Sequence, residues 1–195
     1  MIEAGRISDL KWTDDNWIFV DIGFSGKKKS CGVIFGGEQA ECLTFGNAQR
    51  KIAQFVSAKT SVNLVIEAPL SVCFSRNGDP EGRDLEKLKG ATRYWYCGLG
   101  CVVMTAAIYL VRAVALSNPT ARIRLFEGFV SYKKKGAYSD HRADVERLRE
   151  AVRNSDVASF RAPKALNGGE LRSALAIAGI ECDCPAIIYV GPGPS

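Results

Sequence analysis

The stretch WIFVDIGFS, residues 17–25, combines a buried-strand pattern with a single acid. Its four leading apolar residues favour a buried strand, in which an unpaired carboxylate would be costly. We therefore expect Asp21 where the strand emerges, held by a cation, a hydrogen bond or water. Gly23 would let the backbone turn sharply or come close to a ligand. The stretch by itself suits either a metal ligand or an aspartate that caps a turn.

The composition is that of an ordinary soluble globular protein. The chain has 195 residues, of which 47% are hydrophobic and 24% charged. This length suits a single domain over residues 1–195, and the tail at 191–195 (GPGPS) is expected to be disordered. The net charge of +5 permits a polyanionic partner. Lysines also cluster at Lys27–Lys29 and at Lys133–Lys135.

The cysteines and the N-terminus indicate a reducing compartment, and we expect a cytoplasmic protein. The seven cysteines contain no CxxC pair, and His141 is the single histidine, so a zinc site is not expected. The first twelve residues lack the apolar core of a signal peptide. The uncharged segment Tyr94–Val111 is long enough to span a bilayer. Small or polar residues dilute it, so we interpret it as a buried core helix and expect no membrane partner.

Apolar runs and turn residues predict a chain in which strands and helices alternate. Strands are expected at 17–21, 30–35, 41–44, 61–67, 122–127 and 186–190, and helices at 48–58, 94–116, 141–152 and 170–178. Three antiparallel strands followed by helix-connected parallel strands are typical of the ribonuclease H-like fold. We therefore expect an α/β protein with a five-stranded mixed sheet flanked by helices. The fourth strand should lie beside the first and parallel to it, with the fifth next to the fourth.

Three of the predicted strands end on an acid, namely Asp21, Glu67 and Glu127. The carboxyl ends of parallel strands form the edge at which open α/β sheets place their sites. Neighbouring carboxylates repel one another, and oxygen-rich sites suit Mg²⁺ or Mn²⁺. We expect Asp21, Glu67 and one further acid to lie within about 4 to 8 Å of each other, as two-metal hydrolysis of phosphodiesters requires.

Five segments of the chain also resemble motifs of a protein family. They are VDIGFSG at 20–26, IEAPLS at 66–71, ATRYWYCGLG at 91–100, FEGFVSYK at 126–133 and ELRSALAIAGI at 170–180. They are similar to motifs of the predicted ribonuclease H-like nucleases, a family of uncharacterised domains. The resemblance implies that Asp21 and Glu67 are the first two metal-binding acids. It also implies that Glu170 is the third, where an aspartate is more usual, which leaves Glu127, Asp140 and Asp144 as alternatives.

Several residues near these acids suit contacts with nucleic acid. Arg93 with the aromatic cluster Tyr94–Tyr96 could hold a phosphate and stack bases, or could begin the core helix. The lysines Lys133, Lys134 and Lys135 suit phosphate binding. His141 is either a solvated residue at a helix start or a proton shuttle.

The sequence thus favours a metal-dependent nuclease that acts on DNA or RNA with Mg²⁺ or Mn²⁺. One alternative is a non-catalytic nucleic-acid-binding or assembly protein that kept the fold. Another is an actin-like nucleotide phosphotransferase, but those enzymes need two copies of the fold and this chain has room for one. A homodimer or a larger assembly is compatible with each of these functions.

Overall fold

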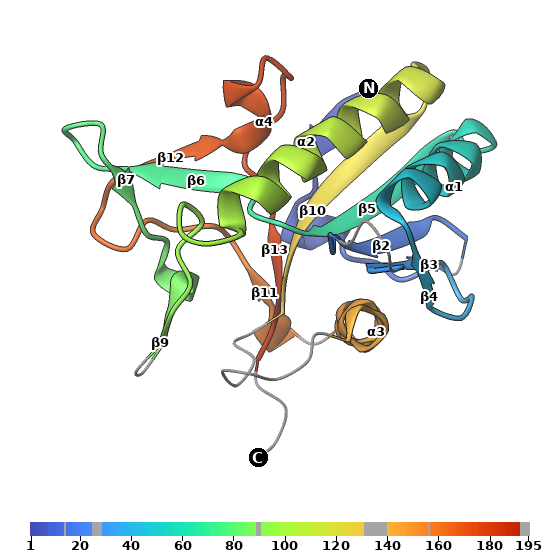
Figure 1. The fold of residues 1–195 in the computed structure, drawn as a ribbon, viewed down its shortest axis with the longest axis horizontal. Coiled ribbons are helices and arrows are strands. Elements are labelled where there is room, and N and C mark those ends of the chain that lie inside the picture. Colours follow the sequence, from blue (N-terminus) through green and yellow to red (C-terminus); the bar gives the residue numbers. More distant parts are fainter. Residues whose placement is uncertain (14, 25–28, 89–90, 131–139, 156, 192–195) are drawn as a thin grey trace.

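The computed structural model describes residues 1–13, 15–24, 29–88, 91–130, 140–155 and 157–191. It is an α/β structure with a mixed central sheet and four α-helices in these ranges (Figure 1). The predicted tail at 192–195 and the lysines at 133–135 lie outside the described residues.

The central sheet has the strand order β11-β13-β10-β5-β2-β3-β4, with β1 paired to β10. The strands β10, β5 and β2 are mutually parallel, whereas β3 and β4 run antiparallel after β2. The predicted positions of β5 beside β2 and of β10 beside β5 are therefore confirmed. The strands are β1 Ile2–Ala4, β2 Trp17–Asp21, β3 Cys31–Phe35, β4 Glu41–Leu43, β5 Ser61–Glu67, β10 Arg122–Val130, β11 Phe160–Arg161 and β13 Ile187–Val190.

The described sheet has eight strands, where five were expected. The strands β1 and β11 have three and two residues, which is too short for an alternating pattern to stand out in the sequence. They are placed by pairing with β10 and β13, strands that are far away along the chain.

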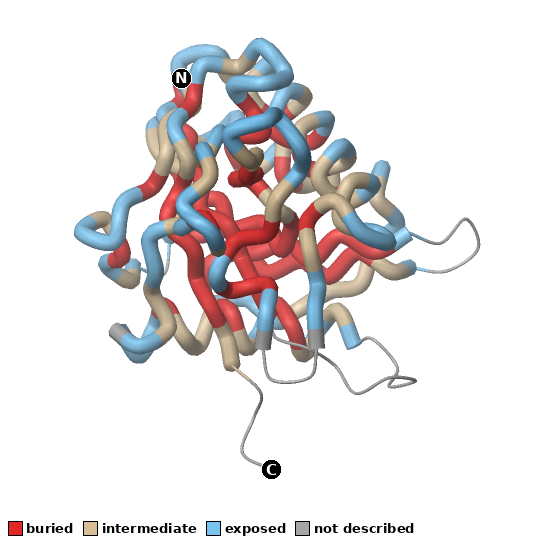
Figure 2. The backbone as a smooth tube through the Cα atoms, turned by 90° about the vertical axis from the view of Figure 1, so that its left-hand side faces the viewer, coloured by how far each residue is buried: buried red, intermediate tan, exposed pale blue. Residues whose placement is uncertain are grey.

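Helices cover both faces of the sheet (Figure 1). The helices α1 Phe45–Ser57 and α2 Gly100–Ser117 pack together on one face, and α3 His141–Arg153 packs on the other. A large apolar core lies under α1 and α2, and a second core lies under α3. Figure 2 shows the buried residues gathered along the strands between these layers.

The alternation of side chains along β2 and β5 decides which way their last residues point. Ile18 and Val20 belong to the core under α1 and α2, whereas Trp17 and Phe19 belong to the core under α3. Because successive strand residues point to opposite faces, Asp21 continues the α3 face. The same reasoning applies to β5, in which Val65 belongs to the α3 core and Glu67 follows two residues later.

A second, smaller sheet corrects the prediction for residues 170–178. Its order is β12-β6-β7, formed by Glu170–Ser173, Ser71–Phe74 and Pro80–Glu81. The helix α4 spans only Ala174–Ile177 and is capped by Ser173. The first four residues of the predicted helix pair with β6 instead, because tertiary pairing overrides local helix propensity. The remaining short elements are the strands β8 Lys87–Leu88 and β9 Ala91–Thr92 and the 3₁₀ turns η1 Ile7–Asp9, η2 Asp84–Glu86 and η3 Val157–Ser159.

The helix α2 is less buried than the sequence predicted. It begins at Gly100, so Tyr94–Tyr96 precede it, and only 22% of its 18 residues are buried. Ala107, Leu110, Val111 and Val114 face the core, while Val102 and Tyr109 are exposed. With a mean hydropathy of 1.8, the helix is long and apolar enough to cross a membrane by length and composition alone.

Candidate metal centre

Asp21 and Glu67 lie side by side at the carboxyl ends of β2 and β5. They are register partners in the parallel pairing of these strands, and their exposed fractions are 5% and 8%. Burial raises the pKa of Glu67 well above its usual range, and the charge of Asp21 and a hydrogen bond with it raise this pKa further. Arg93 acts in the opposite direction, with its Nη2 3.7 Å from Glu67 Oε1. Ionising both carboxyl groups of this buried pair is therefore unfavourable unless a cation lies beside them.

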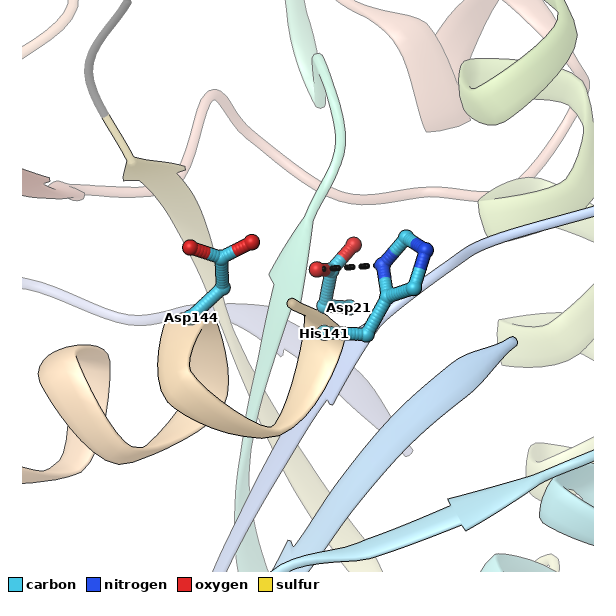
Figure 3. Close-up of side chains that lie close together, drawn as sticks. All are labelled: Asp21, His141 and Asp144. Atoms are coloured by element: carbon cyan, nitrogen blue, oxygen red, sulfur yellow. Dashed lines mark hydrogen bonds and ion pairs between the residues drawn. The ribbon is translucent and has the colours of Figure 1, made fainter. Parts of the chain in front are cut away.

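The first turn of α3 brings two further potential ligands, His141 and Asp144, to this pair. Asp140 caps the helix, because its Oδ1 accepts hydrogen bonds from the backbone N–H groups of Arg142 and Ala143. His141 and Asp144 are three residues apart and therefore lie on one face of the helix. The Nδ1 atom of His141 is 2.7 Å from Asp21 Oδ2, and Asp144 is buried (Figure 3).

One potential ligand atom from each of Asp21, His141 and Asp144 lies within 4.8 Å of the other two. Two carboxylates and an imidazole are ligands that a divalent cation accepts. Burial and, after it, the charge of Asp21 raise the pKa of Glu67, and a divalent cation would offset the charge of Asp21. Of the three acids expected within about 4 to 8 Å of each other, Asp21 and Asp144 have carboxylate oxygens within 4.8 Å, and Glu67 is not a member of this group.

Two glycines allow α3 to approach the sheet so closely. A Cβ atom on Gly23 would collide with the carbonyl oxygen of Ser30 and with the ring of His141. A Cβ atom on Gly32 would collide with the backbone of His141. Gly23 therefore serves the close approach that the sequence suggested, and the group that approaches is the imidazole.

Glu127 does not join the centre, although it ends a predicted strand beside Glu67. Its register partner is Ile66, which faces the core under α1 and α2, so Glu127 points away from α3. Its Oε2 accepts hydrogen bonds from the backbone N–H groups of Leu70 and Ser71, at 2.9 and 3.1 Å. Its Oε1 accepts from Arg83 Nη1 at 2.6 Å. Glu127 is thus a buried structural residue.

Glu170 is also placed away from the centre. It lies on β12 opposite Phe74, is exposed, and forms an ion pair with Arg172 at 2.9 Å. Figure 1 shows β12 in the smaller sheet, apart from the start of α3. Of the alternatives for the third acid, Asp144 on α3 is the one that lies close to Asp21.

Arg93 and the neighbouring aromatic residues lie beside Glu67. They line a cavity of about 50 Å³ together with Phe129 and the start of α2. Arg93 is about half exposed, at 53% of its side chain, and its guanidinium lies over the Phe129 ring. Trp95 is buried and donates its Nε1–H to the carbonyl of Glu81. Among these residues, Arg93 forms an ion pair with Glu67 of the candidate centre.

His141 was expected to be a solvated residue or a proton shuttle, whereas the structure makes it a potential ligand beside Asp21. The signal was present as a histidine and an aspartate three residues apart, directly after a capping aspartate. This spacing indicates a metal site only when the helix is known to pack against the carboxyl ends of β2 and β5.

The chain matches no family model, no curated protein and no solved structure.

Proposed function

We propose that this chain is a metal-dependent nuclease that hydrolyses phosphodiester bonds in DNA or RNA. One observation carries the proposal: ligand atoms of Asp21, His141 and Asp144 lie within 4.8 Å of each other, beside the buried Glu67. We assign Asp21, Glu67, His141 and Asp144 as the residues that hold Mn²⁺ or Mg²⁺.

The strand order supports assignment to the ribonuclease H-like fold. Numbered along the chain, β4-β3-β2-β5-β10 is the order 3-2-1-4-5, with three antiparallel strands followed by two parallel ones. The acids stand at the carboxyl edge of the first and fourth of these strands, and α3 adds its ligands from the face that Asp21 and Glu67 share. The family resemblance of the sequence motifs agrees with this assignment.

Each residue of the centre has a part in such a reaction. Divalent ions, when bound, supply activation of a water and stabilisation of the leaving oxygen of a phosphodiester. Asp21, Asp144 and Glu67 hold the charge that such ions require, and Asp21 fixes the orientation of the His141 ring. Arg93 is half exposed beside Glu67 and can bind a phosphate of the substrate.

The test is cleavage by wild type and Asp21→Asn, screened on single- and double-stranded DNA, RNA and hybrids with Mn²⁺ or Mg²⁺. The variant is nearly isosteric and removes the central charge, so cleavage should fall by about a hundredfold or more. Glu170→Gln is the matched control and should cleave as wild type does, because Glu170 is exposed on β12.

Equal cleavage by wild type and Asp21→Asn would contradict the proposal and point to a contaminating nuclease. Nucleic-acid binding without cleavage of any substrate by the wild type would favour the non-catalytic binding protein instead.

A further inference from the structure

Three aromatic rings form a row on the surface next to the metal centre. The ring centroids of Phe24 and Phe45 are 6.3 Å apart, and those of Phe45 and Tyr109 are also 6.3 Å apart. Phe24 is 48% exposed and Tyr109 is 59% exposed. The rings come from three segments, the end of β2, the start of α1 and the middle of α2, so the row is a feature of the fold.

The row begins at the same edge of the sheet as the metal centre. Phe24 follows Asp21 by three residues, so their Cα atoms are at most about 11 Å apart. Asp21 pairs with Gly32, and Gly32 pairs with Cys42, which aligns the end of β4 with the end of β2. Phe45 starts α1 three residues after Cys42, and it therefore lies at this edge as well.

The charge around the row favours a polyanion. Neither α1 nor α2 contains an aspartate or glutamate, and their charged residues are Arg50, Lys51 and Arg112. Lys51 is paired with Glu41, whereas Arg50 and Arg112 are exposed. Arg112 is three residues from Tyr109 and so lies one helical turn further along the same side of α2.

We propose that Phe24, Phe45 and Tyr109 are a stacking platform for unpaired bases of the strand that reaches the metal centre. Aromatic side chains stack on bases of any sequence, and bases within a duplex do not expose their faces. The inference rests on the proposed nuclease function and names its substrate class: nucleic acid with a single-stranded segment next to the cleaved bond. The backbone of that segment would be held by Arg50 and Arg112.

The experiment measures binding in EDTA, without cleavage, by fluorescence anisotropy. The probes are an oligo-dT of roughly ten nucleotides, an abasic strand of the same length, and a duplex. Phe24→Ala and Tyr109→Ala should each weaken oligo-dT binding by about five- to a hundredfold. The same variants should bind the abasic strand and the duplex as wild type does. Phe24→Trp and Tyr109→Phe keep the ring and should retain binding, and Leu116→Ala, an exposed apolar residue later on α2, is the matched control.

Unchanged oligo-dT binding by both alanine variants would overturn the platform. An equal loss on all three probes would also overturn it, because stacking requires bases. A change in oligomeric state or in vesicle binding with oligo-dT affinity intact would assign the row to a second copy of the chain or to a lipid surface. Because cleavage is not measured, failure of the nuclease proposal would appear separately, in the Asp21→Asn comparison.

Discussion

Glu67 makes the pH dependence of the metal-free protein testable at the scale of one residue. Burial and the charge of Asp21 raise its pKa in the folded state, whereas an unfolded glutamate titrates near about 4.3. The folded protein therefore binds more protons than the unfolded chain, and the free energy of unfolding should fall as pH rises above about 4.3. The fall should end once Glu67 is ionised in the folded state. Urea unfolding in EDTA measures the free energy of unfolding at each pH. In Glu67→Gln this free energy should depend less on pH. If the free energy of unfolding changed with pH as steeply in Glu67→Gln as in wild type, Glu67 would not be the cause of the pH dependence.

His141 should influence which metal the centre prefers. A nitrogen ligand suits transition metals, whereas Mg²⁺ favours an all-oxygen site. We expect wild type to bind Mn²⁺ more tightly than Mg²⁺, and His141→Asp to narrow that difference by about tenfold or more. Calorimetric titration with each metal alone measures both affinities. If His141 only accepted a proton during hydrolysis, the variant would lose activity while the ratio of metal affinities stayed the same.

At the scale of elements, a buried ion cluster of Arg83, Glu86 and Glu127 holds the segment after Glu67, because Glu127 accepts hydrogen bonds from the backbone of Leu70 and Ser71. Arg83 is fully buried and pairs with Glu127 at 2.6 Å and with Glu86 at 2.8 Å. Arg83→Met would leave two buried carboxylates without their cation, so the free energy of unfolding should fall by about 3 to 5 kcal/mol. Arg122→Ala, which breaks the exposed pair with Glu3, should cost less than about 1 kcal/mol. Denaturant unfolding measures the loss of stability in both variants. Similar losses in Arg83→Met and Arg122→Ala would contradict the prediction.

The predictable elements are those with a local signal. Strand β5 ends at Glu67 as predicted, because a run in which six of seven residues are buried leaves little ambiguity. The start of α3 was also predicted, because Asp140 is a strong capping residue. Glu127 was misplaced because β10 continues beyond it to Val130, and one residue of register turns its side chain to the face under α1 and α2. Glu170 was misplaced because β12 forms only by pairing with β6, a contact that no local pattern records.

At the scale of the whole molecule, the proposed metal ligands and the proposed base-stacking rings lie on opposite faces of the sheet, near the same edge. The metal ligands lie on the α3 face, where Asp21 and Glu67 meet the first turn of α3. Phe45 on α1 and Tyr109 on α2 place the aromatic row on the opposite face, and Phe24 begins it three residues after the end of β2. A strand crossing the carboxyl ends of β2 and β5 would thus contact metal ligands on one side and stacking rings on the other.

The net charge of +5 predicts how nucleic-acid binding responds to salt. Each phosphate contact that is lost should reduce the slope of log affinity against log salt by about 0.7 to 0.9. Replacing Lys133, Lys134 and Lys135 with alanine should therefore lower the slope by about 2 to 3 if all three contact phosphates. Arg153→Ala is the control, because Arg153 ends α3 at the opposite end from His141 and should leave the slope unchanged. Binding isotherms for oligo-dT over a range of KCl concentrations measure the slopes. A slope equal to that of wild type in the triple variant would show that these lysines are solvated and make no contact, which would leave Arg50, Arg93 and Arg112 as the residues to test for phosphate binding.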